Sequence, residues 1–274
     1  MKAYLNYFKL RIITNLQYRS AALAGISTQL FFGFLYIMLY LAIYESNTSV
    51  NAPMDWSSLV TYLWLQQAFF AVTYPFMKDQ ELLNMIKNGN LAYELVRPQS
   101  FFWKFYIKML SERLVSALLR CVPIITISLL LPYPYKLSLP PTLGTFILFI
   151  LALSFACLLV TSLSLIVHII TMFTLDARGI TSAYSMIAEV FMGIVIPLPF
   201  FPKWMMKISN ILPFRFIGDF PYRTFSGSIG FAEGREMLII SGIWAPSPTR
   251  RQIPDALPYL WTHLSSSNRL PRLQ

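Results

Sequence analysis

Residues 143–171 read L-G-T-F-I-L-F-I-L-A-L-S-F-A-C-L-L-V-T-S-L-S-L-I-V-H-I-I-T, and this stretch decides the class of fold. It contains no Asp, Glu, Lys or Arg, and it exceeds the roughly 20 apolar residues that span a bilayer as an α-helix. Its hydroxyl side chains, at Ser154, Thr161, Ser162 and Ser164, are of the small polar kind that lets membrane helices pack closely. The stretch therefore predicts a transmembrane helix.

Further apolar blocks lie on both sides of this helix. Those long enough to cross a bilayer are Ala21–Tyr44, Ser57–Met77, Leu114–Leu131 and Thr181–Phe200. A sixth block begins at Met237 but meets Pro246, so it is too short to cross at about 1.5 Å per residue. The predicted fold is an all-α polytopic membrane protein with five transmembrane helices and a truncated sixth.

The composition supports a membrane location. The chain has 274 residues, of which 56% are hydrophobic and only 12% are charged, whereas soluble domains carry roughly 25% charged residues. A net charge of +10 then indicates membrane topology and anionic lipid headgroups before nucleic-acid binding. Cys121 and Cys157 lie inside apolar blocks, and His168 and His263 are far apart, so the sequence predicts no metal site.

Basic residues predict the orientation. The first segment carries Lys2, Lys9, Arg11 and Arg19, the loop 45–56 carries no base, and the loop 78–113 carries six. The positive-inside rule therefore places the N-terminus and the second loop in the cytoplasm of a multi-pass protein of the cell membrane. The bases between residues 203 and 235 disagree with this orientation, because it places them outside the cell. We keep the orientation because the first spans usually determine it. We predict an interfacial helix for the first 20 residues.

Two stretches outside the predicted spans carry a family resemblance. Residues 86–99 read I-K-N-G-N-L-A-Y-E-L-V-R-P-Q, and residues 210–227 read N-I-L-P-F-R-F-I-G-D-F-P-Y-R-T-F-S-G. The stretch 86–99 resembles the cytoplasmic coupling segment of ABC-2-type permeases, the membrane subunits of ATP-driven exporters. The stretch 210–227 is similar to that family's outer re-entrant segment before the sixth span. Taken together, residues 1–244 resemble an ABC-2-type transmembrane domain.

The resemblance implies a permease subunit of an ABC exporter, which forms its pathway with a second membrane half, identical or homologous. The chain contains no phosphate-binding loop of the form G-x-x-x-x-G-K-[ST]. ATP and Mg²⁺ are therefore expected on a separate ATPase subunit, with no catalysis, cofactor or nucleic-acid partner for this chain. Membrane lipids are its other expected partners.

The coupling segment has residues suited to docking in a groove of an ATPase. In this prediction Gly89 lets the chain turn into the segment, and Pro98 fixes the direction in which the chain leaves it. The contacts with the ATPase come from Leu91, Tyr93, Glu94, Leu95 and Arg97. The alternative is a solvated cytoplasmic loop whose Gly and Pro only terminate helices. The predicted re-entrant segment has its own marker residues, at Pro213, Phe214, Asp219, Pro221 and Gly227.

Two charges fall inside predicted spans. Arg120 lies in the third predicted span and Glu189 in the fifth. Charges at bilayer depth are costly and usually face other helices or water, so we hypothesise that the two side chains pair or that one lines the substrate path. The alternatives are that Arg120 extends to the nearer interface and that Glu189 is protonated and hydrogen-bonded in the bundle.

Residues 245–274 do not continue the pattern. They are rich in Pro, Arg and Ser, contain no Lys and have no long apolar run, so we expect a disordered or loosely interfacial tail. The hypothesis is a shift of the reading frame near codon 245, because the resemblance calls for a full sixth span here. The nucleotide sequence tests it: an adjacent frame must encode about 15 or more largely apolar residues.

Two other functions compete with the exporter permease. One is a non-transporting membrane partner of an ABC complex, such as a sensor or immunity subunit. The other is a membrane-embedded transferase, which needs a pair of acidic residues or a similar site on a loop. Asp79 and Glu81 are the only close acidic pair on the large cytoplasmic loop, and the other acids are scattered.

Overall fold

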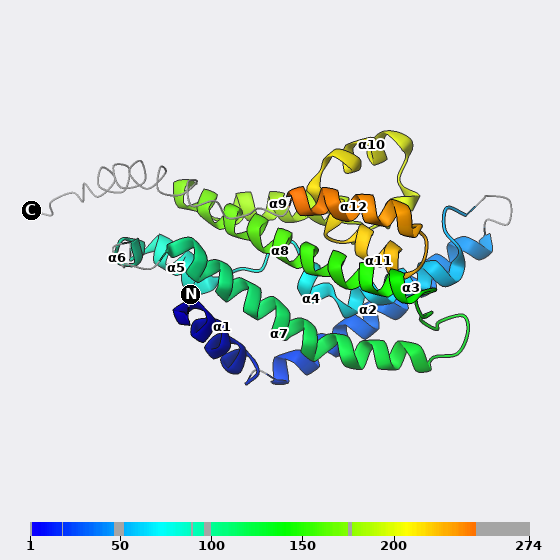
Figure 1. Cartoon of the computed structure of the whole chain (residues 1–274), viewed down its shortest axis with the longest axis horizontal. Coiled ribbons are helices and arrows are strands. Elements are labelled where there is room, and N and C mark those ends of the chain that lie inside the picture. Colours follow the sequence, from blue (N-terminus) through cyan, green and yellow to red (C-terminus); the bar gives the residue numbers. More distant parts are fainter. Residues whose placement is uncertain are drawn as a thin grey trace, which may run out of the picture.

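The computed structural model describes residues 2–17, 19–46, 52–88, 90–95, 100–174 and 177–244, and the regular elements in these ranges are all helices (Figure 1). This confirms the all-α prediction. Three helices are long and apolar enough to cross a membrane: α2 (Arg19–Ser46), α7 (Phe101–Leu130) and α8 (Leu143–Thr174). The structure thus supports three of the five predicted spans by length and composition. The predicted tail, 245–274, lies outside the described residues.

The second predicted span is a broken helix. Asp55 caps α3 (Trp56–Ala68) by accepting a hydrogen bond from the backbone N–H of Ser57, and the helix stops at Phe69 before the single turn α4 (Phe70–Thr73). Every residue of α3 from Leu59 to Ala68 is buried inside the chain. Its apolar sequence is explained by burial against protein on all sides, which sequence length alone does not distinguish from contact with lipid.

The fifth predicted span is also shorter than expected. The helix α9 (Ala177–Phe191) has 15 residues, which is about 22 Å of axis against a hydrocarbon thickness of about 30 Å. It ends before Gly193, whose positive φ of 79° turns the chain away from the helix axis. The chain continues through the 3₁₀ helix η1 (Leu198–Phe200).

The helix α7 begins earlier than the sequence predicts. The predicted loop ran to Arg113, but the helix already starts at Phe101, so Lys104, Lys108 and Arg113 are helical residues. Between α4 and α7 lie two short helices, α5 (Gln80–Lys87) and α6 (Leu91–Leu95). They sit near the N-terminal helix α1 (Lys2–Asn15) at one end of the elongated molecule, and α1 packs along α7 (Figure 1).

The remaining helices form one group that packs partly on α8. These are α10 (Lys203–Ile211), the 3₁₀ helix η2 (Pro213–Phe216), α11 (Asp219–Phe225) and α12 (Phe231–Trp244). The helix α3 is central, since α2, α7 and α11 all contact it, and α11 and α12 also pack on α8. The core there includes Trp64, Tyr62 and Tyr222, and the Trp64 ring lies against Gly33 of α2, where a Cβ atom would come within 2.6 Å of it.

Candidate functional site

The predicted coupling segment is a short helix held by the chain itself. Leu91 is buried in a cluster with Leu82, Phe105 and Met109, so it anchors α6 to the chain's own core. Glu94 binds Nζ of Lys104 at 2.5 Å and is also largely buried. Of the three predicted contact residues whose side chains are described, Tyr93 is the exposed one, at 75%.

The other four residues of this prediction are not tested by the described part of the chain. Leu95 is the last residue of α6, but its side chain is not among those described, and Gly89, Arg97 and Pro98 lie outside the described residues. Within the described chain, Leu91 packs in its own core and Glu94 pairs with Lys104, and docking of these residues to an ATPase stays a prediction. Both hold the segment in place, and Tyr93 is left as its accessible ring.

A charged cluster ties α5 to α7 and α1. Nζ of Lys108 lies 2.8 Å from Oδ1 of Asp79 and 2.6 Å from Oε2 of Glu81, and Arg11 lies 3.5 Å from Glu81. Asp79 also caps α5, because its Oδ1 accepts a hydrogen bond from the backbone N–H of Leu82. Burial raises the pKa of Glu81, but the hydrogen bond and charge of Lys108, with the charge of Arg11, outweigh it and lower the pKa.

A buried arginine holds the chain that leads from α4 to α5. The guanidinium of Arg113 donates hydrogen bonds to the carbonyl oxygens of Val72 (3.0 Å) and Tyr74 (2.7 Å) and to Oγ of Ser164 (2.8 Å). Ser164 in turn donates to the carbonyl of Pro75 at 2.8 Å. Arg113 is completely buried, so this side chain satisfies carbonyl groups that the end of α4 leaves unpaired.

A buried histidine completes the attachment from α8. Nε2 of His168 accepts a hydrogen bond from the backbone N–H of Asp79 at 3.2 Å, and Nδ1 lies 2.7 Å from the carbonyl of Ser164, to which it donates. The ring stacks on Phe76, with 4.6 Å between the ring centroids. We call these six residues the linker anchor: Asp79, Glu81, Lys108, Arg113, Ser164 and His168.

The linker anchor joins the short helices to the two longest ones. Residues 72–79 are bound from α7 by Lys108 and Arg113 and from α8 by Ser164 and His168. The sequence does not predict this role, because Lys108 and Arg113 fall in the predicted loop 78–113 as two of its basic residues. Both members of the Asp79 and Glu81 pair are bound to Lys108.

The predicted re-entrant segment folds as a compact group of short helices against α3, α8 and the end of α9. Pro213 and Phe214 lie in η2, Asp219 and Pro221 lie in α11, and Gly227 follows α11 with a positive φ of 76°. Asp219 is fully buried, 3.6 Å from the guanidinium of Arg223.

The end of α9 is contacted both by α3 and by the residue that precedes α11. Nε2 of Gln66 donates to the carbonyl oxygens of Gly193 (3.1 Å) and Ile194 (2.9 Å). At Gly218, an added Cβ atom would lie 2.3 Å from the carbonyl oxygen of Met192, so only glycine fits between the two segments.

The two charges predicted at bilayer depth are not brought together. Arg120 lies against α2, where a Cβ atom on Gly25 would come within 2.6 Å of Cζ of Arg120. Glu189 lies on α9, which packs on α8 and η2. No ion pair joins the two side chains within the described part of the chain, so a coupling between them would have to act indirectly.

Comparison with known proteins identifies the family. A family model described as ABC-2 family transporter protein matches residues 30–245, more than three quarters of the chain. The matched region contains α5, α6, the linker anchor and the group around α11. No curated protein and no solved structure matches the chain.

Proposed function

The chain belongs to the ABC-2 family of transporter proteins, and on that premise we propose that it is the permease subunit of an ABC exporter. It forms, with a second membrane half that is identical or homologous, the pathway through which a separate ATPase drives substrate out of the cell. Permeases of this family are typically non-catalytic membrane subunits. In this proposal ATP and Mg²⁺ belong to the ATPase.

The linker anchor is the observation that carries the proposal. A coupling helix is useful only if its movement reaches the helices that line a pathway. Here α5 and α6 follow a linker whose backbone is held by Arg113 of α7 and by Ser164 and His168 of α8. Because these contacts are buried and polar, they are costly to break singly, so a displacement of α6 is transmitted to both long helices.

The proposal places five segments across the cell membrane, with the N-terminus, α5 and α6 in the cytoplasm. Three of these segments are the long helices. The fourth is α3 together with α4, and the fifth is α9. Broken or short helices are tolerated at membrane depth where protein covers them, and α3 is covered on all sides.

Tyr93 gives the sharpest test of docking. An exposed aromatic ring is a frequent source of binding energy at interfaces, so Tyr93→Ala should reduce the yield of co-purified ATPase by about tenfold or more, while the chain still inserts in the membrane. Tyr133→Ala is the matched control, since Tyr133 is also exposed but lies between α7 and α8. Equal yields from both variants would contradict docking through α6.

Assays of ATP hydrolysis and substrate uptake distinguish a permease from a non-transporting partner of an ABC complex. The complex of this chain, its second half and the ATPase is reconstituted in vesicles, and ATP hydrolysis is measured with and without candidate substrates. Substrate-stimulated hydrolysis and uptake into inside-out vesicles support the permease. Assembly with neither activity supports the sensor or immunity subunit.

A further inference from the structure

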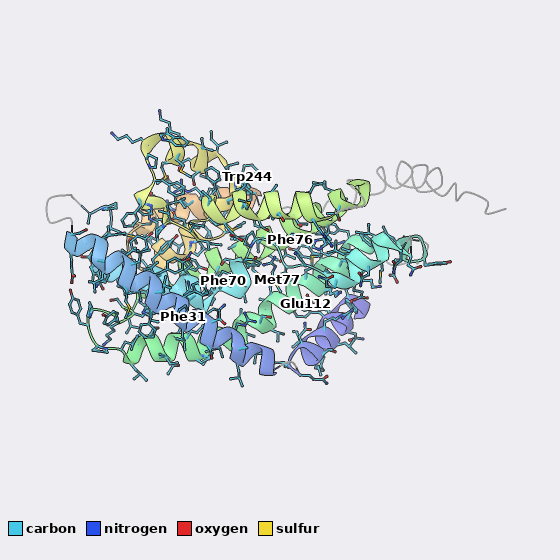
Figure 2. All side chains as sticks on the ribbon, turned by 180° about the vertical axis from the view of Figure 1, so that it is seen from behind. Phe31, Phe70, Phe76, Met77, Glu112 and Trp244 are labelled. Carbon is cyan, nitrogen blue, oxygen red and sulfur yellow. The ribbon has the colours of Figure 1, made fainter. Side chains whose placement is uncertain are left out.

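A cavity of about 200 Å³ lies beside the linker anchor, where α1, α2 and α7 meet the segment before α5. Asn15 and Ala22 line it from the elbow between α1 and α2, and Met77 lines it from the linker. Its other polar walls come from Glu112, Ser116 and Arg120 of α7. Figure 2 shows Glu112 and Met77 close to each other, near the point where α1 and α2 approach α7.

Two donor groups of this cavity have no hydrogen-bond partner in the described part of the chain. Nε of Arg120 and Nδ2 of Asn15 are both buried without a hydrogen bond. Arg11 and Lys108, whose charges act on Glu112, are already paired with Glu81 and Asp79, and no ion pair joins Glu112 to another described residue. Unpaired buried polar groups are costly, so the cavity is complementary to a ligand with one anionic and one cationic group.

The order of these charges along α7 indicates the ligand. Glu112, Ser116 and Arg120 recur every four residues on one face, and about 12 Å of helix axis separates the first from the last. Glu112 is nearer to α5 and α6, the cytoplasmic end in the proposed orientation. In the cytoplasmic leaflet, an aminophospholipid presents its ammonium group toward water and its phosphate below it. The acid and the base therefore lie in the order of that headgroup.

We propose that this cavity binds the headgroup of phosphatidylethanolamine from the cytoplasmic leaflet. The Arg120 guanidinium and the Asn15 amide donate to the phosphate, and the Glu112 carboxylate accepts from the ammonium. A trimethylated choline cannot donate those hydrogen bonds, and phosphatidylglycerol offers no cation to Glu112. Gly25 makes room for Arg120, since any Cβ there meets the guanidinium. The orientation of the lipid rests on the proposed membrane topology.

Native mass spectrometry of the delipidated full-length chain tests this proposal. Phosphatidylethanolamine, phosphatidylglycerol and phosphatidylcholine with identical acyl chains are added singly, and retained lipid is counted. We expect at least about tenfold stronger retention of phosphatidylethanolamine, as charge-assisted hydrogen bonds predict. Equal retention of the three lipids by the parent chain overturns the proposal without any variant.

Two variants locate the site. Arg120→Gln should lose the retained phosphatidylethanolamine, and Glu112→Gln, the milder change, should lower the preference over phosphatidylglycerol. Lys136→Gln removes the same charge from an exposed loop and should change nothing. Parent-like selectivity in Glu112→Gln would overturn the assignment even if Arg120→Gln fails to fold.

Soluble O-phosphoethanolamine distinguishes a lipid from a free metabolite. If O-phosphoethanolamine displaces the lipid at a concentration comparable to that of the lipid, the acyl chains contribute nothing to binding. That result would overturn the lipid assignment. Retention of the lipid supports it. The readout is independent of ATPase assembly, so a failure here is distinguishable from a failure of the permease proposal.

Discussion

Arg113 is a buried charge whose hydrogen bonds go to backbone carbonyls and one hydroxyl. Replacing it by Met removes these donors and leaves the carbonyls of Val72 and Tyr74 buried and unpaired. We expect Arg113→Met to lower the free energy of unfolding by about 3 kcal/mol, measured as thermal unfolding of the purified chain in detergent. Arg235→Met, on an exposed turn of α12, should stay within about 0.5 kcal/mol. Equal effects would contradict the anchoring role.

Glu81 makes the linker anchor sensitive to acid. Its folded-state pKa is lowered, because Lys108 and Arg11 together outweigh burial. A group with a depressed pKa stabilises the fold above its unfolded pKa of about 4.3, and this contribution is lost as pH falls through the folded value.

Glu81→Gln should therefore flatten the loss of melting temperature below about pH 4.5. The effect at neutral pH should be below about 1 kcal/mol, because 43% of the side chain is exposed. Glu236→Gln, which is exposed on α12, should keep the parent profile. A parent-like profile in Glu81→Gln would show that another group controls the acid response.

The junction between α9 and α11 depends on a close approach of two backbones. Gly218→Ala places a Cβ atom 2.3 Å from the carbonyl oxygen of Met192, which cannot move without its helix end. We expect a loss of about 1–3 kcal/mol or more, as overpacking usually costs, with the melting temperature as the measurement. Gly230→Ala is the matched control, since its added Cβ meets nothing within 4 Å. Equal stability of the two variants would refute the packing argument.

The sequence predicts the long helices well because length and hydropathy are local properties. The uncharged run of residues 143–171 lies within α8 as expected. The short segments are less predictable, since α3 is apolar for burial inside the chain and not for contact with lipid. A helix buried in protein and a helix in contact with lipid differ in their neighbours, and the composition of the helix does not show which neighbours it has.

The contacts of the candidate site could be predicted from the sequence only in small part. The short helix α6 lies within residues 86–99, and its Leu91 packs in the chain's own core, a contact that the motif does not predict. The linker anchor is not readable from spacing because its bonds join distant residues, such as Asp79 with Lys108 and with His168. Lys108 and Arg113 resemble ordinary positive-inside charges until the helix is seen to begin at Phe101.

The topology of the whole molecule is testable with single cysteines. Cys121 and Cys157 are buried, so a chain with both replaced by Ala is the background for Asn88→Cys or Lys136→Cys, two exposed positions. An impermeant maleimide added to intact cells should label Lys136→Cys. It should label Asn88→Cys only after the membrane is opened, because the proposal places α5 in the cytoplasm. The reverse pattern would invert the proposed orientation.

The hydrogen bonds with which Arg113 and Ser164 hold the linker have an evolutionary consequence. The carbonyl oxygens of residues 72, 74 and 75 belong to the peptide backbone, which every amino acid supplies. Substitutions at these positions therefore leave the hydrogen bonds intact as long as the backbone keeps its path. We expect diverging homologues to retain an arginine and a small hydroxyl residue at positions 113 and 164 while the linker drifts. The mechanical connection can thus be inherited through relatives whose linkers no longer align.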